Sequence, residues 1–142
     1  MALKTILQAD LDAAVAASLL CWRSKNREGY YAALSGYDFT ASAVTIANYA
    51  CLVDGRFTKT RFNTLNLTGT DFSNIDGRYS MFRTCNLTSA DFSHADLYGA
   101  DFTNANLTNA DFSGAAMQNA ILTGATLTGA RFDNCDRTGA IY

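Results

Sequence analysis

Aspartate residues that recur 20 positions apart are the most chemically suggestive feature of this sequence. Asp71, Asp91 and Asp111 form one set, and Asp76 and Asp96 form another. If residues 20 apart stack, neighbouring carboxylates lie about 5 Å apart, where they could bind a cation or raise each other's pKa. Alternatively, each carboxylate accepts hydrogen bonds from nearby backbone in an Asx-type turn and faces water.

The cysteines and the single histidine do not form a second candidate reactive site. Cys21, Cys51, Cys85 and Cys135 are 30, 34 and 50 residues apart and include no CxxC pair. Cys85 and Cys135 stand where alanine stands elsewhere, so we expect small buried residues rather than zinc ligands or a disulfide. His94 is expected to be a solvated turn residue. The sequence has no catalytic-triad or P-loop motif, so we predict no catalytic residue, no cofactor, no metal site and no enzymatic activity.

The element that must position these residues is a five-residue repeat that runs from Arg56 to Asp133. A large apolar residue, here called the centre, occupies every fifth position, with Gly77 as the only break, and a small residue stands two positions before it. The centres are Phe57, Phe62, Leu67, Phe72, Phe82, Leu87, Phe92, Leu97, Phe102, Leu107, Phe112, Met117, Leu122, Leu127 and Phe132. A period of five matches neither a helix nor a strand. Fixed-period self-similarity predicts a solenoid.

Centres that are 20 residues apart are alike, which predicts that they stack. Three columns are uniform or nearly so: Phe72, Phe92, Phe112, Phe132; Leu67, Leu87, Leu107, Leu127; and Phe62, Phe82, Phe102, Leu122. Like residues suit columns in which side chains interdigitate at the strand spacing of about 4.8 Å. The fourth column holds Phe57, Gly77, Leu97 and Met117, and we expect Ile75 to fill the space that Gly77 leaves.

The repeat resembles the pentapeptide-repeat family, whose unit reads A-(D/N)-(L/F)-x-x. Consecutive units from Ala90 to Asn109 read ADFSH, ADLYG, ADFTN and ANLTN. The resemblance covers residues 56–133 closely and residues 50–55 and 134–142 more loosely. It implies an all-β solenoid, a right-handed quadrilateral β-helix with four repeats in each coil. An Asp or Asn before the centre is the family consensus, which favours the turn interpretation of the aspartate sets.

Three regions are expected along the chain. Residues 1–30 are predicted to form an N-terminal α-helical cap, with a helix over residues 6–26 whose apolar face recurs every fourth residue. That face comprises Leu7, Leu11, Val15 and Leu19. Residues 31–55 are predicted to be a transitional, degenerate coil, and residues 56–142 the repeat β-helix. The apolar run at residues 13–22 is too short to span a bilayer, so no membrane association is expected.

We predict that the protein is a rigid protein–protein interaction or structural assembly module. Its 142 residues have a net charge of −2, a balance that makes nucleic-acid binding unlikely because no dense basic stripe is present. Exposed tyrosine, methionine and arginine residues are enriched at protein interfaces. The candidate interaction surface is Arg56, Arg61, Arg78, Tyr79, Met81, Arg83 and Tyr98. The absence of a paired-cysteine framework predicts a reducing, cytoplasmic location.

The alternative function is mimicry of DNA, by which some members of the family bind type II topoisomerases such as DNA gyrase and protect or inhibit them. Such mimicry needs dense negative charge along a rod. Residues 54–136 carry nine aspartates against six basic residues, a net charge of −3. That charge is well short of a DNA surrogate.

The repeat pattern continues to Tyr142 without a helical segment that could cap it. An uncapped coil presents unpaired backbone groups and an apolar cross-section. The candidate residues at this end are Arg137, Ile141 and Tyr142. We therefore expect another subunit to cover the C-terminal coil, either in a two-fold homo-oligomer or in a larger assembly.

Overall fold

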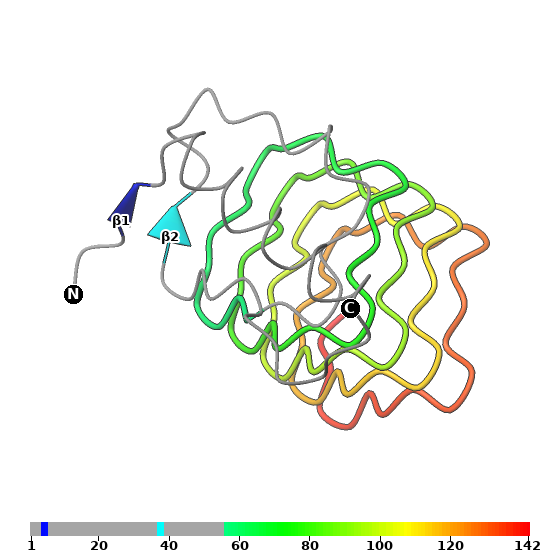
Figure 1. Cartoon of the computed structure of the whole chain (residues 1–142). Coiled ribbons are helices and arrows are strands. Elements are labelled where there is room, and N and C mark those ends of the chain that lie inside the picture. The colour runs from blue at the N-terminus through cyan, green and yellow to red at the C-terminus, as the bar shows by residue number, and fades with distance from the viewer. Residues whose placement is uncertain (1–3, 6–36, 39–55) are drawn as a thin grey trace, which may run out of the picture.

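The computed structural model describes residues 4–5, 37–38 and 56–142. Strand β1 (Lys4–Thr5) pairs in parallel with strand β2 (Tyr37–Asp38), and Lys4 lies opposite Tyr37 (Figure 1). The sequence did not predict this pair. The expected helix over residues 6–26 and most of the expected transitional coil over residues 31–55 lie outside the described residues, so both remain predictions.

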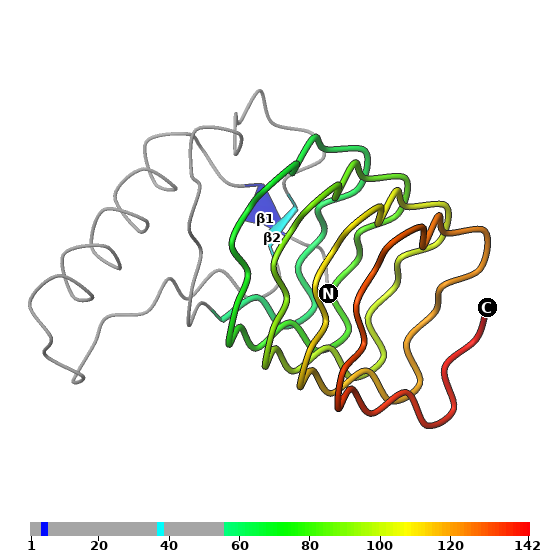
Figure 2. The ribbon, with the colours of Figure 1, turned by 90° about the vertical axis from the view of Figure 1, so that its right-hand side faces the viewer.

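Residues 56–142 wind into a stack of parallel coils, each 20 residues long (Figures 1 and 2). The residue before each centre forms a parallel bridge with the residue 20 positions later, from Arg56 with Asp76 to Ile121 with Ile141. Each side of a coil carries one such bridge between two turns. In residues 56–142 the solenoid is therefore a ladder of single bridges rather than a set of long strands.

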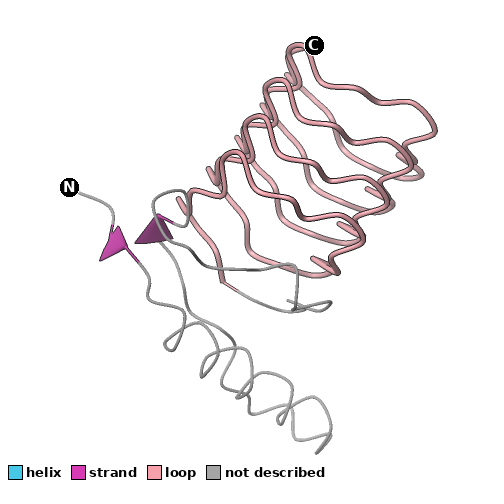
Figure 3. Ribbon diagram, turned by 90° about the horizontal axis from the view of Figure 1, so that it is seen from above, coloured by secondary structure: helices cyan, strands magenta, loops and turns pink. Residues whose placement is uncertain are grey.

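Each coil has four sides, which we number by the centres that stack on them. Face 1 contains Phe57, Gly77, Leu97, Met117 and Arg137; face 2 contains Phe62, Phe82, Phe102, Leu122 and Tyr142. Face 3 contains Leu67, Leu87, Leu107 and Leu127; face 4 contains Phe72, Phe92, Phe112 and Phe132. Viewed from above, the last coil lies at one end of the stack, with the C-terminus on it (Figure 3).

Every repeat makes the same three hydrogen bonds to its neighbouring coil. The Phe92 N–H donates to the Asp111 carbonyl at 2.7 Å, and the His94 N–H donates to the Ser113 carbonyl at 2.9 Å. In the opposite direction, the Asp111 N–H donates to the Ala90 carbonyl at 2.9 Å. These bonds explain why proline, which lacks an N–H, does not occur in the repeat.

The centres form a closely packed core of stacked rings. Phe72, Phe92, Phe112 and Phe132 contact one another in sequence, with ring centroids 4.8 to 5.2 Å apart and planes within 4° of parallel. Rings on adjacent faces meet edge to face, as Phe92 and Phe102 do at 84°. Both arrangements are favoured by the charge distribution of aromatic rings. The predicted columns are confirmed.

The irregular column on face 1 is filled as the sequence predicted. Ile75 is 1% exposed, and a Cβ placed on Gly77 would lie 3.1 Å from Ile75 Cδ1 and 3.0 Å from Leu97 Cδ2. A larger residue at Gly77 would collide with both side chains. Ile75 and Leu97 therefore occupy the volume that a phenylalanine or leucine fills elsewhere in the stack.

The coil turns its corners at the residue two positions after each centre. All of these corner residues, from Lys59 to Gly139, have φ between 54° and 73°. Glycine and asparagine tolerate this left-handed region, whereas threonine rarely enters it. At the corners Thr64 and Thr84, the side-chain hydroxyl donates to the preceding carbonyl at 2.6 Å. This local bond offsets part of the conformational cost.

Candidate interaction surface

The predicted surface residues lie on two faces that meet at the corner occupied by Tyr79. Arg56 and Arg78 are on face 1, and Arg61, Met81 and Arg83 are on face 2. Arg61 and Met81 are bridge partners in successive coils. Tyr98 lies one coil further along face 1. The fold therefore brings together all seven residues of the predicted surface; their role in binding remains a prediction.

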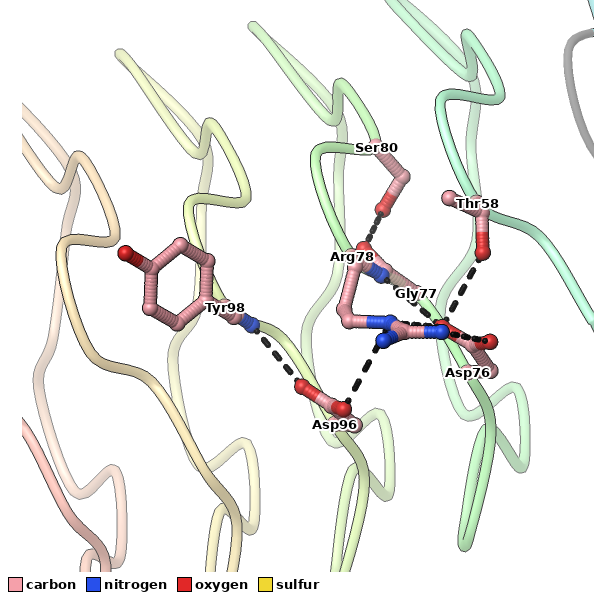
Figure 4. Close-up of polar contacts among 7 residues, drawn as sticks. All are labelled: Thr58, Asp76, Gly77, Arg78, Ser80, Asp96 and Tyr98. Atoms are coloured by element: carbon pink, nitrogen blue, oxygen red, sulfur yellow. Dashed lines mark hydrogen bonds and ion pairs between the residues drawn. The ribbon is translucent and has the colours of Figure 1, made fainter.

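On face 1, Arg78 links the carboxylates of two successive coils (Figure 4). Its Nε and Nη2 atoms donate to the two oxygens of Asp76 at 2.9 and 2.8 Å, and Nε lies 3.6 Å from Asp96 Oδ2. Thr58 donates to Asp76 from the previous coil at 3.0 Å. The hydrogen bonds from Arg78 keep the pKa of Asp76 below its ordinary value. The guanidinium is thus held in one orientation on an exposed face.

Tyr79 and Tyr98 form an exposed aromatic pair beside this network. Their ring centroids are 5.5 Å apart at 71°, and the residues are 48% and 38% exposed. Asn119 Nδ2 donates to the Tyr98 hydroxyl at 2.9 Å. The Tyr79 ring lies over the backbone of Gly99 in the next coil. Both rings therefore present apolar area in a fixed orientation, which lowers the entropy lost on binding.

On face 2, Arg83 covers a nearly buried carboxylate. Asp101 is 5% exposed, and the Nε atom of Arg83 donates to its Oδ2 at 2.6 Å. Burial alone would raise the pKa of Asp101, but hydrogen bonds from Thr103 and Arg83 outweigh it and lower the pKa. The Arg83 N–H also donates to Asn63 Oδ1 in the previous coil at 3.0 Å. Arg83 consequently ties three coils together.

The aspartate sets stack as predicted and form Asx-type turns. Asp71, Asp91 and Asp111 are bridge partners, and each Oδ1 accepts the N–H of the serine two residues later at 2.8 to 2.9 Å. The hydrogen bond from the Ser113 hydroxyl is the main cause of the lowered pKa of Asp111. In residues 56–142 no three acidic, cysteine or histidine side chains cluster in a metal-binding arrangement. The idea that stacked carboxylates raise each other's pKa is therefore wrong for Asp111.

The cysteine and histidine positions also agree with the sequence. Cys85 is 1% exposed, and its thiol donates to the Phe62 carbonyl at 2.9 Å. Burial raises the pKa of Cys85 to about 12, so the reactive thiolate does not form near neutral pH. Cys135 is half-buried against the core, and burial raises the pKa of its thiol as well. His94 is exposed at a corner, as expected.

The last coil exposes part of the core. Leu127, Phe132 and Cys135 are only partly buried, and Ile141 and Tyr142 are 55% and 59% exposed. Arg137 replaces an apolar centre, and its guanidinium lies 4.6 Å above the centre of the Phe132 ring. Arg137 Nη1 also donates to the Tyr142 hydroxyl at 2.9 Å. These two contacts cover part of the apolar cross-section but none of the backbone edge.

Two contributors to the surface were not predicted from the sequence as partners. Asn119 steadies Tyr98 from 21 residues away, and Thr58 reaches Asp76 from 18 residues away. Their separations are close to the 20-residue coil period, so a search for polar pairs near that spacing would have found them. The described residues include no helix that is long and apolar enough to cross a membrane.

The fold and the repeating bridges define a parallel β-solenoid. The family model for pentapeptide repeats matches residues 85–124 and 100–139. The chain therefore belongs to the pentapeptide-repeat proteins, which confirms the resemblance drawn from the sequence. Comparison with curated proteins gives no match.

Solved structures of other pentapeptide-repeat proteins show the same fold. A protein from the thylakoid lumen of Arabidopsis thaliana is 31% identical over 76% of this chain and 59% of that chain, with a TM-score of 0.55. A protein from Nostoc PCC 7120 is 22% identical over 66% and 69%, with a TM-score of 0.50. A protein from the cyanobacterium Cyanothece 51142 is 29% identical over 61% and 63%, with a TM-score of 0.45. This chain thus spans less than two thirds of the Arabidopsis and Cyanothece chains. The family relationship implies a right-handed β-helix.

Proposed function

We propose that the protein is a non-enzymatic module that binds another protein through the two faces meeting at Tyr79. The fixed Tyr79–Tyr98 pair carries this proposal. Tyrosine offers a large contact area with little conformational entropy to lose, and arginine can pair with a partner's carboxylate. Here Asn119 and Gly99 hold the rings, and Asp76 holds Arg78 next to them.

The test is affinity capture from the native host with the full chain as bait. The variant Tyr79→Ala/Tyr98→Ala removes the rings, and Thr128→Ala, at an exposed site on face 3, serves as the matched control. We expect the wild type and Thr128→Ala to capture the same partner and the double variant to lose at least tenfold of it. Equal capture by all three folded proteins would overturn the proposal.

A separate contact is proposed for the C-terminal coil, which we suggest binds another subunit. The exposed Ile141 and Tyr142 and the partly exposed Phe132 support this contact. Sedimentation velocity over a range of concentrations tests it, with Ile141→Lys compared with Thr128→Lys. Association that Ile141→Lys abolishes is the expected result. A wild-type protein that stays strictly monomeric and binds no subunit through this coil would contradict it.

The DNA-mimic function with DNA gyrase as the target is the weaker proposal. Asp76, Asp101 and Asp111 are each paired with an arginine, so much of the negative charge on faces 1, 2 and 4 is neutralised. A supercoiling assay distinguishes the functions: we expect the protein neither to inhibit gyrase nor to protect it from a quinolone. Inhibition or protection at stoichiometric protein would favour mimicry instead.

A further inference from the structure

The coil stack has a hydrogen-bonding direction that follows from its repeating bonds. In each repeat the centre and the corner donate their N–H groups toward the C-terminal end, as Leu97 and Gly99 do to the carbonyls of Ala116 and Gln118. Only one N–H per repeat points the other way, as that of Ala116 does to the Ala95 carbonyl. Each coil therefore offers the next coil two donors for every acceptor.

This imbalance appears at the edge of the last coil. The N–H groups directed outward there belong to the centres Leu127, Phe132, Arg137 and Tyr142 and to the corners Gly124, Gly129, Asn134 and Gly139. The outward carbonyls belong to Ala125, Ala130, Cys135 and Ala140. Within residues 56–142 neither group has a hydrogen-bond partner. An edge rich in unpaired donors favours a partner that is rich in acceptors.

We propose that this edge binds an extended segment of a partner protein that runs parallel to the last coil and presents mainly carbonyl oxygens. The inference rests on the proposed contact at the C-terminal coil and specifies the partner's chemistry. The geometry is that of strand addition at a sheet edge. The bonds required are those that Phe92 and His94 make to Asp111 and Ser113 one coil earlier, at 2.7 and 2.9 Å.

The same pattern disfavours a two-fold pairing of two C-terminal edges. In such a pair the chains run antiparallel, so the centre N–H of one copy meets the outward carbonyl of the other, and the reverse. Those bonds use every available carbonyl. The corner N–H groups of both copies, such as those of Gly129 and Asn134, then face no acceptor. A buried donor without a partner is costly, whereas a parallel, acceptor-rich segment satisfies both sets.

Amide hydrogen exchange measured by NMR on the full chain distinguishes these arrangements. The probe is a synthetic peptide with the sequence of residues 104–123, because the carbonyls of this segment accept the corresponding N–H groups of the preceding coil, from Leu87 to Asn104. A peptide with the reversed sequence is the matched control. We expect exchange to slow at least tenfold at both centres and corners, including Phe132 and Asn134, with the first peptide only.

Two results would overturn the inference. Slower exchange at the centres but not the corners in concentrated protein would show two-fold pairing, which leaves the proposed C-terminal contact intact. Unchanged exchange with the peptide, while sedimentation shows association that Ile141→Lys abolishes, would show that subunits meet without strand addition. If sedimentation also shows no association, the C-terminal contact itself fails.

Discussion

The ring of Tyr79 lies directly over Gly99, the corner residue of the next coil. A Cβ on Gly99 would lie 2.8 Å from Tyr79 Cδ1 and 2.9 Å from Cε1, closer than real contacts allow. His94 lies over Gly114 in the same way, and Asn104 lies over Gly124. A large side chain at one corner thus requires glycine at the corner above it. This coupling between coils fixes the orientation of Tyr79 in the proposed binding surface.

Gly99→Ala should destabilise the protein more than Gly69→Ala. Both glycines have positive φ, 62° and 66°, so alanine costs roughly 1–2 kcal/mol at either site. A Cβ on Gly69 would meet nothing within 4 Å, whereas one on Gly99 must displace Tyr79. We expect the free energy of unfolding to fall by about 1–3 kcal/mol more for Gly99→Ala, as measured by urea denaturation.

The double variant Tyr79→Ala/Gly99→Ala provides the control for that comparison. Removing the ring relieves the clash, so the two changes should be less than additive. Additive losses, or equal losses for Gly69→Ala and Gly99→Ala, would show that the ring does not constrain the corner.

Phe102→Ala should be among the most destabilising single changes in the stack. Phe102 is fully buried, stacks on Phe82 at 5.0 Å and meets Phe92 and Phe112 edge to face. The cavity should cost about 3–5 kcal/mol. Leu127→Ala, at a partly buried centre of the last coil, should cost less. An unchanged melting temperature for Phe102→Ala would contradict the stacked core.

Stability should fall in acid through Asp101. Its pKa is lower in the folded protein than its ordinary value of 3.8, so the unfolded chain binds more protons as the pH falls below that value. The stabilisation by Asp101 is therefore complete above the unfolded pKa and is lost as the pH falls through the folded pKa. We expect Asp101→Asn to be less stable than the wild type at pH 7 and to lose less stability between pH 4 and pH 2. Parallel pH profiles for the two proteins would count against this role.

Cys85 should resist alkylation while the protein is folded. Its thiol is buried, with a pKa of about 12, whereas Cys135 is half-buried in the last coil. Timed treatment with iodoacetamide at pH 8, followed by mass spectrometry of peptides, should show Cys135 modified at least tenfold faster. Equal rates for these two thiols under native conditions would mean that the coil around Cys85 opens readily.

Much of the fold could be predicted because the repeat repeats its own physics. Once centres 20 residues apart were matched, the phenylalanine columns and the filling of Gly77 by Ile75 followed from volume alone. The same period placed Tyr79 and Arg78 on adjoining parts of one surface.

Other features depend on geometry that no short pattern expresses. The pairing of Arg78 with two carboxylates depends on a rotamer that spans two coils, and the hydrogen bond from Asn119 to Tyr98 depends on how far the ring leans. The donor-rich edge depends on which way each N–H points, which a hydrophobic pattern does not record. The sequence therefore predicted the candidate residues but not the contacts that hold them.

Site-specific photo-crosslinking tests the proposed binding surface most directly. A photoreactive phenylalanine derivative is placed at Tyr98, and in a second protein at Thr128 on face 3, and both are expressed in the native host. We predict one dominant crosslinked partner protein from position 98, and its loss when Tyr79→Ala is added. Position 128 should give no such product. The same partner from both positions, or none from position 98 in a folded protein, would contradict a binding role for the faces that meet at Tyr79.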